Sequence, residues 1–371
     1  RSESRALTGN ANQRSLRVMS LRLIRANRRA PLLAALFAGL FATSCASHRP
    51  APPHAAAPPE NYMRLARPDN DTVELQIAVR RFVPARRSQP VVWLAGASHI
   101  GEPAYYQALQ KHLDGQALVL FEGVAEERRH ARATEPKRPA SEDTSLQSNL
   151  ARSLGLVFQL DAIDYEKPHF RNSDLTIREL QVLMEGEAAV QQSTGAATDG
   201  PPADNSFNQL VSVMDGSSFL GAVVQGVVKL IGSNPKLQAL AKLAFIETLG
   251  QLEGDLARAQ ALPPDLKRLM EVLIHHRNDV VIRELREEMG KPKPPASISV
   301  FFGAAHMPDM ERRLTQELNY RPADQIWVPA FSVSPAKAGL SPAEITMVHA
   351  VVKWQMQILN AQEGAGKTGL Q

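Results

Sequence analysis

The chain carries the same tetrapeptide pattern, Gly-x-x-His, at two distant places, Gly96–His99 and Gly303–His306. Each copy directly follows a short apolar run, and Glu122 follows a third run of the same kind. Such runs are typical of strands that are buried on both faces. Because ligands bind open α/β sheets at the carboxyl ends of the strands, we expect His99, Glu122 and His306 to meet at one sheet edge.

Two imidazoles and one carboxylate suit hydrolytic chemistry of two kinds. They can bind a divalent cation that polarises a carbonyl and lowers the pKa of bound water toward ~7. Without a metal, they can act as general acid and general base. His99 and His306 are 207 positions apart in the sequence, which excludes a local helical metal motif. These two histidines and Glu122 are therefore the candidate catalytic and metal-binding residues.

The elements that must position these side chains alternate between strands and helices. A helical pattern begins at Pro103, between the first two strands, and helical spacing dominates 175–290. The predicted strands are 91–95, 117–121 and 298–302. This order predicts an α/β fold with a central mixed or largely parallel sheet, flanking helices and a helical insertion.

These motifs resemble those of the TraB/GumN family, which includes the TIKI membrane-anchored metalloproteases. The resemblance extends from about Tyr62 to Val333. It rests on the paired Gly-x-x-His motifs, on a glutamate after the second core strand that matches Glu122, and on an arginine of a late helix that matches Arg277. Segments that look like the GumN branch are 154–159, 162–165 and 170–175.

The resemblance implies metal-dependent cleavage of peptides, with Mn²⁺ or Co²⁺ as the usual metal and Zn²⁺ also compatible. By position, His99, Glu122 and His306 would bind the metal or transfer protons. Arg277 would orient a carboxylate or stabilise an oxyanion, because its planar guanidinium holds charge in a fixed geometry. A structural salt bridge is an equal alternative for Arg277.

Several further polar residues lie near these motifs. We expect Asp174 to cap a helix that begins near Leu175. Asp164 and Tyr165 can border the pocket, and Asp309 can either support His306 or start a helix. The remaining histidines near the motifs are expected at the surface or in packing, namely His112, His275 and His276.

Residues 1–45 are typical of a secretion signal. A basic leader precedes the apolar run 31–42, which is about half of the ~20 residues that a membrane-spanning helix needs. The ending Ala42–Cys45 resembles a bacterial lipobox, which predicts that Cys45 receives lipid. Met19 is the expected start, with 1–18 outside the translated chain. An ordinary cleaved signal with an incidental cysteine is the alternative.

The residues after Cys45 predict the place of the protein in the cell. Residues 46–61 hold five prolines and predict a semi-rigid tether to the membrane. Ala46 directly after the lipidated cysteine favours the outer membrane, facing the periplasm, if the organism is Gram-negative. Since Cys45 is the one cysteine of the chain, internal disulfides and thiolate metal clusters are excluded.

After the tether, the sequence predicts one domain over 62–335 and a C-terminal part over 336–371. A capping-box pattern predicts a final helix over 342–359, followed by a disordered tail. The apolar segment 219–231 is too short to span a membrane and predicts a core or cap helix. We expect an apolar stripe of the final helix to pack in the core, formed by Met347, Val351, Trp354 and Ile358.

The net charge argues against nucleic-acid binding. The chain has a formal charge of +4, but eight arginines and one glutamate in the first 30 residues give that leader +7, which leaves −3 for the rest. The leading hypothesis is a lipid-anchored, metal-dependent hydrolase of the cell envelope, with a peptide or small-molecule substrate. The alternatives are a non-catalytic lipoprotein that binds metal, haem or a small ligand, and a structural envelope protein.

Overall fold

A computed structural model describes the chain at residues 61–86, 88–124, 146–185, 228–251 and 270–367. These residues all belong to one unit, Ala55–Gln371. The predicted secretion signal with Cys45, nearly all of the tether and most of 219–231 lie outside the described residues. Within the described residues, no helix is both long and apolar enough to span a membrane.

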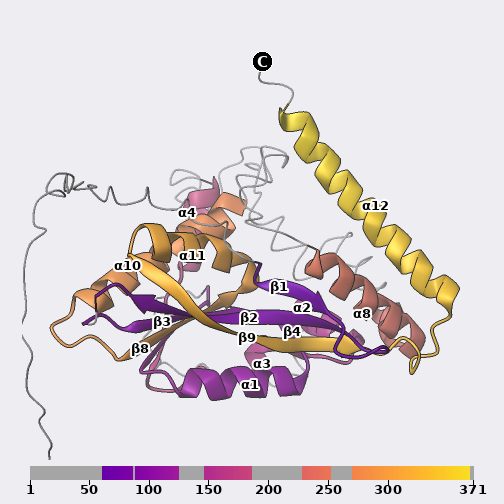
Figure 1. Cartoon of the computed structure of the whole chain (residues 1–371), viewed down its shortest axis with the longest axis horizontal. Coiled ribbons are helices and arrows are strands. Elements are labelled where there is room, and N and C mark those ends of the chain that lie inside the picture. The colour runs from indigo at the N-terminus through magenta and orange to yellow at the C-terminus, as the bar shows by residue number, and fades with distance from the viewer. Residues whose placement is uncertain (1–60, 87, 125–145, 186–227, 252–269, 368–371) are drawn as a thin grey trace, which may run out of the picture. The chain divides into compact units, whose positions relative to one another are not determined.

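A mixed sheet of seven strands lies at the centre of this unit (Figure 1). The strands follow the order β1-β2-β3-β8-β5-β7, and β9 pairs with β2. Their bounds are β1 Met63–Ala66, β2 Val73–Pro84, β3 Val91–Ala97, β5 Leu118–Phe121, β7 Phe170–Asn172, β8 Ser297–Gly303 and β9 Tyr320–Val333. Two short strands, β4 (Ile100–Gly101) and β6 (Val157–Phe158), form a separate pair. The predicted α/β class is confirmed.

The strands that precede the candidate residues are parallel neighbours. β8 lies between β3 and β5, with Ala97 opposite Gly303 and Phe121 opposite Phe301. The three predicted strands thus form the parallel part of the sheet together with β7. Because parallel strands end at the same edge, the residues that follow β3, β5 and β8 are brought to one place.

The helices pack on this sheet, and Figure 1 shows α1 on one side of it and α11 on the other. Helix α1 begins at the predicted Pro103, and its apolar face is buried at Tyr105, Tyr106, Leu109 and Leu113. The described parts of 175–290 are mainly helical. The helices are α1 Pro103–Asp114, α2 Leu146–Ser153, α3 Gln159–Ala162, α4 Ile177–Glu185, α8 Pro235–Gly250, the π-helical segment η2 Glu271–His276, α10 Arg277–Gly290, the 3-10 turn η3 Ala304–His306, α11 Met307–Gln316 and α12 Pro342–Lys367.

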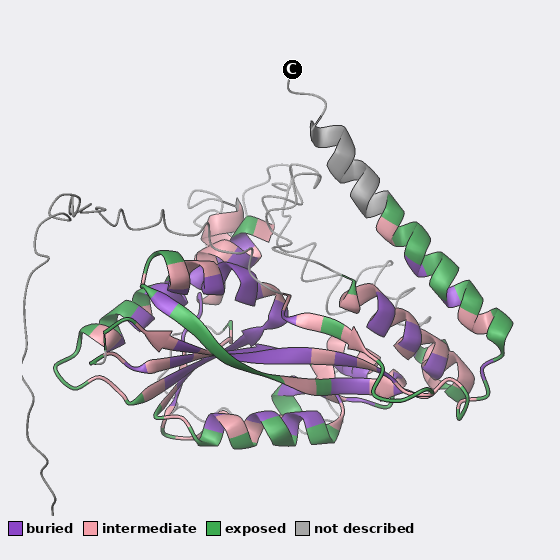
Figure 2. Ribbon diagram, in the orientation of Figure 1, coloured by how far each residue is buried: buried purple, intermediate pink, exposed green. Residues whose placement is uncertain are grey.

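The core lies along the central strands, which are buried in Figure 2. Leu94, Val300 and Phe301 are fully buried there. Burial of one such side chain stabilises the fold by about 1.5–3 kcal/mol. The core therefore fixes the ends of the strands that precede the candidate residues.

The prediction for the stripe on α12 is wrong. Met347, Val351 and Trp354 are 57%, 46% and 62% exposed, whereas Val348 and Val352 are buried. Ile358 has a side chain outside the described part of the structure. The helix carries a second apolar face, which packs toward α8, and apolar spacing alone does not decide which of two faces is covered.

Candidate active site

Glu122 lies directly after β5, and each of its carboxylate oxygens has a partner. Oε1 accepts a hydrogen bond from Nη2 of Arg277 at 2.7 Å. Oε2 accepts one from the backbone N–H of Gly303 at 2.6 Å. Because β5 and β8 are parallel neighbours, the carboxylate at the end of β5 reaches the backbone at the end of β8. The sheet itself therefore fixes the position of Glu122.

Arg277 is the first residue of α10 and follows the π-helical segment η2 directly. Its guanidinium forms a fork on Asp174, with Nε 2.9 Å from Oδ1 and Nη2 2.6 Å from Oδ2. The backbone N–H of Gly123 also donates to Oδ2 of Asp174, at 2.9 Å. Bidentate pairs of this kind are strong, charge-assisted hydrogen bonds. One guanidinium thus joins Glu122 after β5 to Asp174 after β7.

The helix cap predicted for Asp174 is wrong. Helix α4 begins at Ile177, and its capping box is formed by Thr176 and Glu179. The backbone N–H of Glu179 donates to Oγ1 of Thr176 at 3.2 Å, and that of Thr176 donates to Oε2 of Glu179 at 2.8 Å. Asp174 lies too early in the chain for this role, and its carboxylate binds Arg277 instead.

His306 is held by Asn278 in one tautomer. Nδ2 of Asn278 donates to the backbone oxygen of His306 at 3.2 Å and to Oδ2 of Asp309 at 3.0 Å. Its Oδ1 therefore faces Nδ1 of His306, at 2.8 Å, and Nδ1 carries the proton. In a neutral imidazole this leaves a lone pair on Nε2, which lies 3.7 Å from Oε1 of Glu122.

His99 reaches the same place from the end of β3. A Cβ atom on Gly303 would lie 3.3 Å from Oε2 of Glu122, 3.6 Å from Nε2 of His99 and 3.7 Å from Cδ2 of His306. The expected meeting of the three side chains at one sheet edge is therefore observed, and the absent side chain of Gly303 leaves room for it. His306 is buried and His99 is exposed, so the cluster opens to solvent at His99.

Burial and neighbouring charges set the protonation of this cluster. Burial opposes the charge of Glu122, but His306 and Arg277 outweigh it and lower the pKa of Glu122 to about 2. Burial lowers the pKa of His306 to about 4, although Glu122 acts in the opposite direction. At neutral pH the site therefore combines a carboxylate, a neutral imidazole and a guanidinium.

These side chains, as placed, do not form a metal site. A catalytic divalent cation needs about three protein ligands with free lone pairs. His306 offers Nε2, but the guanidinium of Arg277 lies 2.7 Å from Oε1 of Glu122, where its positive charge would repel a cation, and Oε2 accepts from the N–H of Gly303. Among the described residues, no group of three or more His, Cys, Asp or Glu side chains is arranged to hold a metal ion.

Asp309 and Asn278 form a buried support beneath His306. Asp309 lies in the first turn of α11 and accepts hydrogen bonds from Asn278, Arg312 and Arg313. Of the two roles considered for it, Asp309 has the supporting one, through Asn278, whereas α11 begins at Met307 rather than at Asp309. Asn278 was missed by the sequence analysis, although it directly follows Arg277. Nothing in its residue type indicated that it would face His306.

The other candidates from the sequence lie around this cluster. Tyr165 packs on Phe121 with ring centroids 4.9 Å apart, and its hydroxyl accepts from Gln159. His112 packs edge-on against Trp93 of β3. Asp164 is exposed and His276 is half-buried, while His275 lies with Nδ1 3.5 Å from Oδ2 of Asp309.

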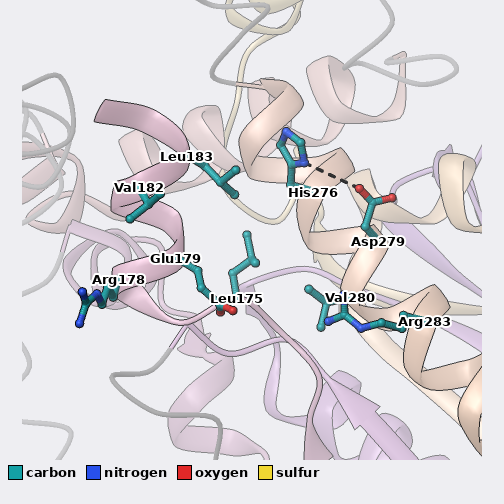
Figure 3. A pocket seen from close by; sticks show the side chains of 9 residues that line it. All are labelled: Leu175, Arg178, Glu179, Val182, Leu183, His276, Asp279, Val280 and Arg283. Carbon is teal, nitrogen blue, oxygen red and sulfur yellow. Dashed lines mark ion pairs between the residues drawn. The ribbon is translucent and has the colours of Figure 1, made fainter. Parts of the chain in front are cut away.

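A pocket of about 490 Å³ lies between α4 and α10 (Figure 3). Apolar side chains form part of its wall, and charged side chains complete it. The lining residues are Leu175, Arg178, Glu179, Val182, Leu183, His276, Asp279, Val280 and Arg283. Two of them are sequence neighbours of the buried ion pairs, since Leu175 follows Asp174 and His276 precedes Arg277.

No known family model, curated protein or solved structure matches this chain. The resemblance to the TraB/GumN family therefore stays a prediction. The chemistry of the site must be argued from its own geometry.

Proposed function

We propose that this chain is a hydrolase of the TraB/GumN type that cleaves peptides in the cell envelope. The observation that carries the proposal is the convergence of His99, Glu122 and His306 on Gly303. It places an exposed imidazole, a carboxylate and a buried imidazole at one sheet edge. This combination of groups suits general acid and base catalysis on a carbonyl substrate.

The buried histidine would act as the base. Nε2 of His306 carries the lone pair because Asn278 holds the proton on Nδ1. A water molecule at Nε2 would lose its proton to this nitrogen as it attacks the peptide carbonyl. Glu122, 3.7 Å away, would stabilise the imidazolium that results. Arg277 keeps Glu122 charged and in place for that role.

The exposed histidine would protonate the leaving group. His99 lies on the solvent side of the same cluster, across Gly303 from His306. His99 would give a proton to the departing amine. Solvent would then return a proton to His99 and take up the one that His306 gained from the attacking water, so that both imidazoles are restored. The proposal thus separates a buried base from an exposed acid.

The metal dependence implied by the resemblance stays a separate prediction. No step of the proposed reaction uses a metal, because the side chains are not arranged to bind one. Peptide cleavage that is unchanged by a chelator would support the metal-free reaction. Cleavage that is lost with chelator and restored by Mn²⁺ or Co²⁺ would show that the reaction needs a metal and would contradict the metal-free reaction.

The decisive experiment measures cleavage of a peptide library by the purified chain. We expect His306→Ala and Glu122→Gln to reduce kcat/KM at least 100-fold, since each removes a group that acts on the reacting atoms. The matched control is His349→Ala, an exposed histidine on α12 that pairs with Glu247. Equal rates for all four proteins would overturn the proposal. Ligand retention without any product would favour the binding lipoprotein instead.

The anchoring at Cys45 is part of the same proposal. We expect the full-length chain to fractionate with membranes and to incorporate labelled palmitate when it is expressed in a Gram-negative bacterium. Cys45→Ala would remove both properties. A soluble wild-type chain without label would contradict the anchor but would leave the hydrolase untouched.

A further inference from the structure

We infer that the pocket between α4 and α10 is a subsite for the C-terminal end of a peptide, binding its terminal carboxylate together with an apolar side chain. This inference rests on the proposed function, because it names the substrate end that the hydrolase selects. Its first support is the shape of the pocket, whose volume of about 490 Å³ lies in the usual range of ligand sites.

The charges of the pocket favour an anion. Arg178 on α4 and Arg283 on α10 are exposed, and neither forms an ion pair or hydrogen bond with another described residue. The acidic side chains of the same wall are already engaged. Glu179 accepts from Thr176 in the capping box, and Asp279 pairs with Arg313. Figure 3 shows Arg283 directed toward the space between the two helices and Arg178 on the outer side of α4. A carboxylate in that space would therefore be neutralised chiefly by Arg283, and Arg178 adds a second positive charge to the wall.

The wall between the arginines is apolar. Figure 3 shows Leu175, Leu183 and Val280 directed toward the space between the two helices. These residues extend a small hydrophobic cluster that also contains Leu180 and Val272. A ligand that joins a negative charge to an apolar group would satisfy both parts of the wall, as the last residue of an apolar peptide does.

The position of the pocket connects it to the candidate active site. Arg277 and Val280 belong to the same helix, one turn apart, and Leu175 directly follows Asp174. Arg277 is thus on α10, which forms one wall of the pocket, and Asp174 directly precedes Leu175 of the other wall. A peptide end held there would contact sequence neighbours of the Arg277–Asp174 pair that fixes Glu122.

Direct binding to the full chain tests the subsite without any need for turnover. We expect N-acetyl-leucine, titrated by NMR, to bind at least ten times more tightly than N-acetyl-leucine amide or N-acetyl-glycine. The double variant Arg178→Gln/Arg283→Gln should lose this preference. Arg286→Gln is the matched control, because Arg286 is an exposed arginine of α10 that pairs with Glu317 outside the pocket. Unchanged thermal unfolding of all variants excludes a folding defect.

Three results would overturn the inference. They are equal binding of acid and amide, equal binding by the double variant and the wild type, and tighter binding of decanoate than of N-acetyl-leucine. The last would assign the pocket to a lipid-derived carboxylate.

Kinetics separate this inference from the proposed function. If Glu122→Gln abolishes peptide cleavage but the double variant keeps the wild-type KM for free-acid peptides, the subsite is wrong and the hydrolase stands. If the chain cleaves nothing but binds N-acetyl-leucine in the arginine-dependent way, the hydrolase is wrong and the subsite stands. The expected result is a KM at least ten times higher in the double variant, with kcat unchanged.

Discussion

Nη2 of Arg277 lies 2.7 Å from Oε1 of Glu122, and the same nitrogen lies 2.6 Å from Oδ2 of Asp174. A single guanidinium therefore compensates two buried carboxylates that follow different strands of the sheet. The structural salt bridge considered for Arg277 is present, and through it Arg277 holds Glu122 in place. The stabilisation of an oxyanion by Arg277 stays a prediction.

We expect Arg277→Met to destabilise the protein by about 3–5 kcal/mol, because it leaves Glu122 and Asp174 buried and uncompensated. Urea unfolding at pH 7 measures this change. Arg286→Gln, which breaks an exposed ion pair with Glu317, should cost less than about 1 kcal/mol. A loss of similar size in both variants would show that the ion pairs of Arg277 contribute no more to stability than an exposed ion pair does.

We expect stability to fall as the pH drops from about 6.5 to 4, in part through His112. Burial lowers the pKa of His112 to about 4, so the unfolded chain binds this proton first and acid favours unfolding. This loss of stability has its full size below the pKa of His112 in the folded protein and is absent above about pH 6.5. It amounts to at most about 3 kcal/mol.

The variant His112→Phe tests this contribution. Phenylalanine keeps the edge-on contact with Trp93 and removes the buried Nε2, which has no hydrogen-bond partner among the residues that the structure describes. Urea unfolding at pH 7 and at pH 4.5 should show a smaller acid loss than in the wild type. An identical loss in the two proteins would assign the acid sensitivity to other groups, foremost His306.

The parallel half of the fold was accessible from the sequence. The apolar runs before Gly96, Glu122 and Gly303 are buried on both faces, so composition alone marks them as strands. The long antiparallel pair of β2 and β9 was not recognised. β2 includes Arg80 and Arg81, and β9 is mostly exposed along its first half, so neither has a continuous apolar run.

The side chains that meet at the candidate site could be predicted from the sequence, but the residues that hold them in place could not. His99, Glu122 and His306 follow strands, and strand order brings them together. Asn278 and Asp174 act through the direction of their side chains within helices and loops, which depends on packing. The role of Asp174 was misjudged because Ser173-Asp174 resembles a cap, whereas Thr176 and Glu179 form it.

Asn278→Ala should allow His306 to adopt both neutral tautomers. The change removes the acceptor at Nδ1 and leaves Asp309 without one of its donors, at a cost of about 1–3 kcal/mol. In the wild type, ¹⁵N NMR should show His306 protonated at Nδ1 alone at pH 7. A mixture of both tautomers is expected in the variant. The same single tautomer in both proteins would contradict the role of Asn278.

The two motif glycines should respond differently to alanine. A Cβ on Gly96 would lie 3.0 Å from Cγ2 of Ile77 and 3.1 Å from the backbone oxygen of Ala78, which cannot move without shifting β2. On Gly303 it would meet side chains, with Glu122 as the nearest at 3.3 Å. We expect Gly96→Ala to cost about 1–3 kcal/mol in urea unfolding and Gly303→Ala to cost less. The reverse order would contradict this account of the glycines.

The exposed stripe of α12 should tolerate polar substitution, although its residues look like core. Trp354→Gln removes a side chain that is 62% exposed and should change the free energy of unfolding by no more than about 0.5 kcal/mol. Val352→Ala, two residues earlier on the buried face, should cost about 1–2 kcal/mol because it leaves a cavity against α8. Urea unfolding of the purified protein measures both. If Trp354→Gln destabilises the protein more than Val352→Ala does, α12 packs against α8 through the face of Met347, Val351 and Trp354 rather than through the face of Val348 and Val352.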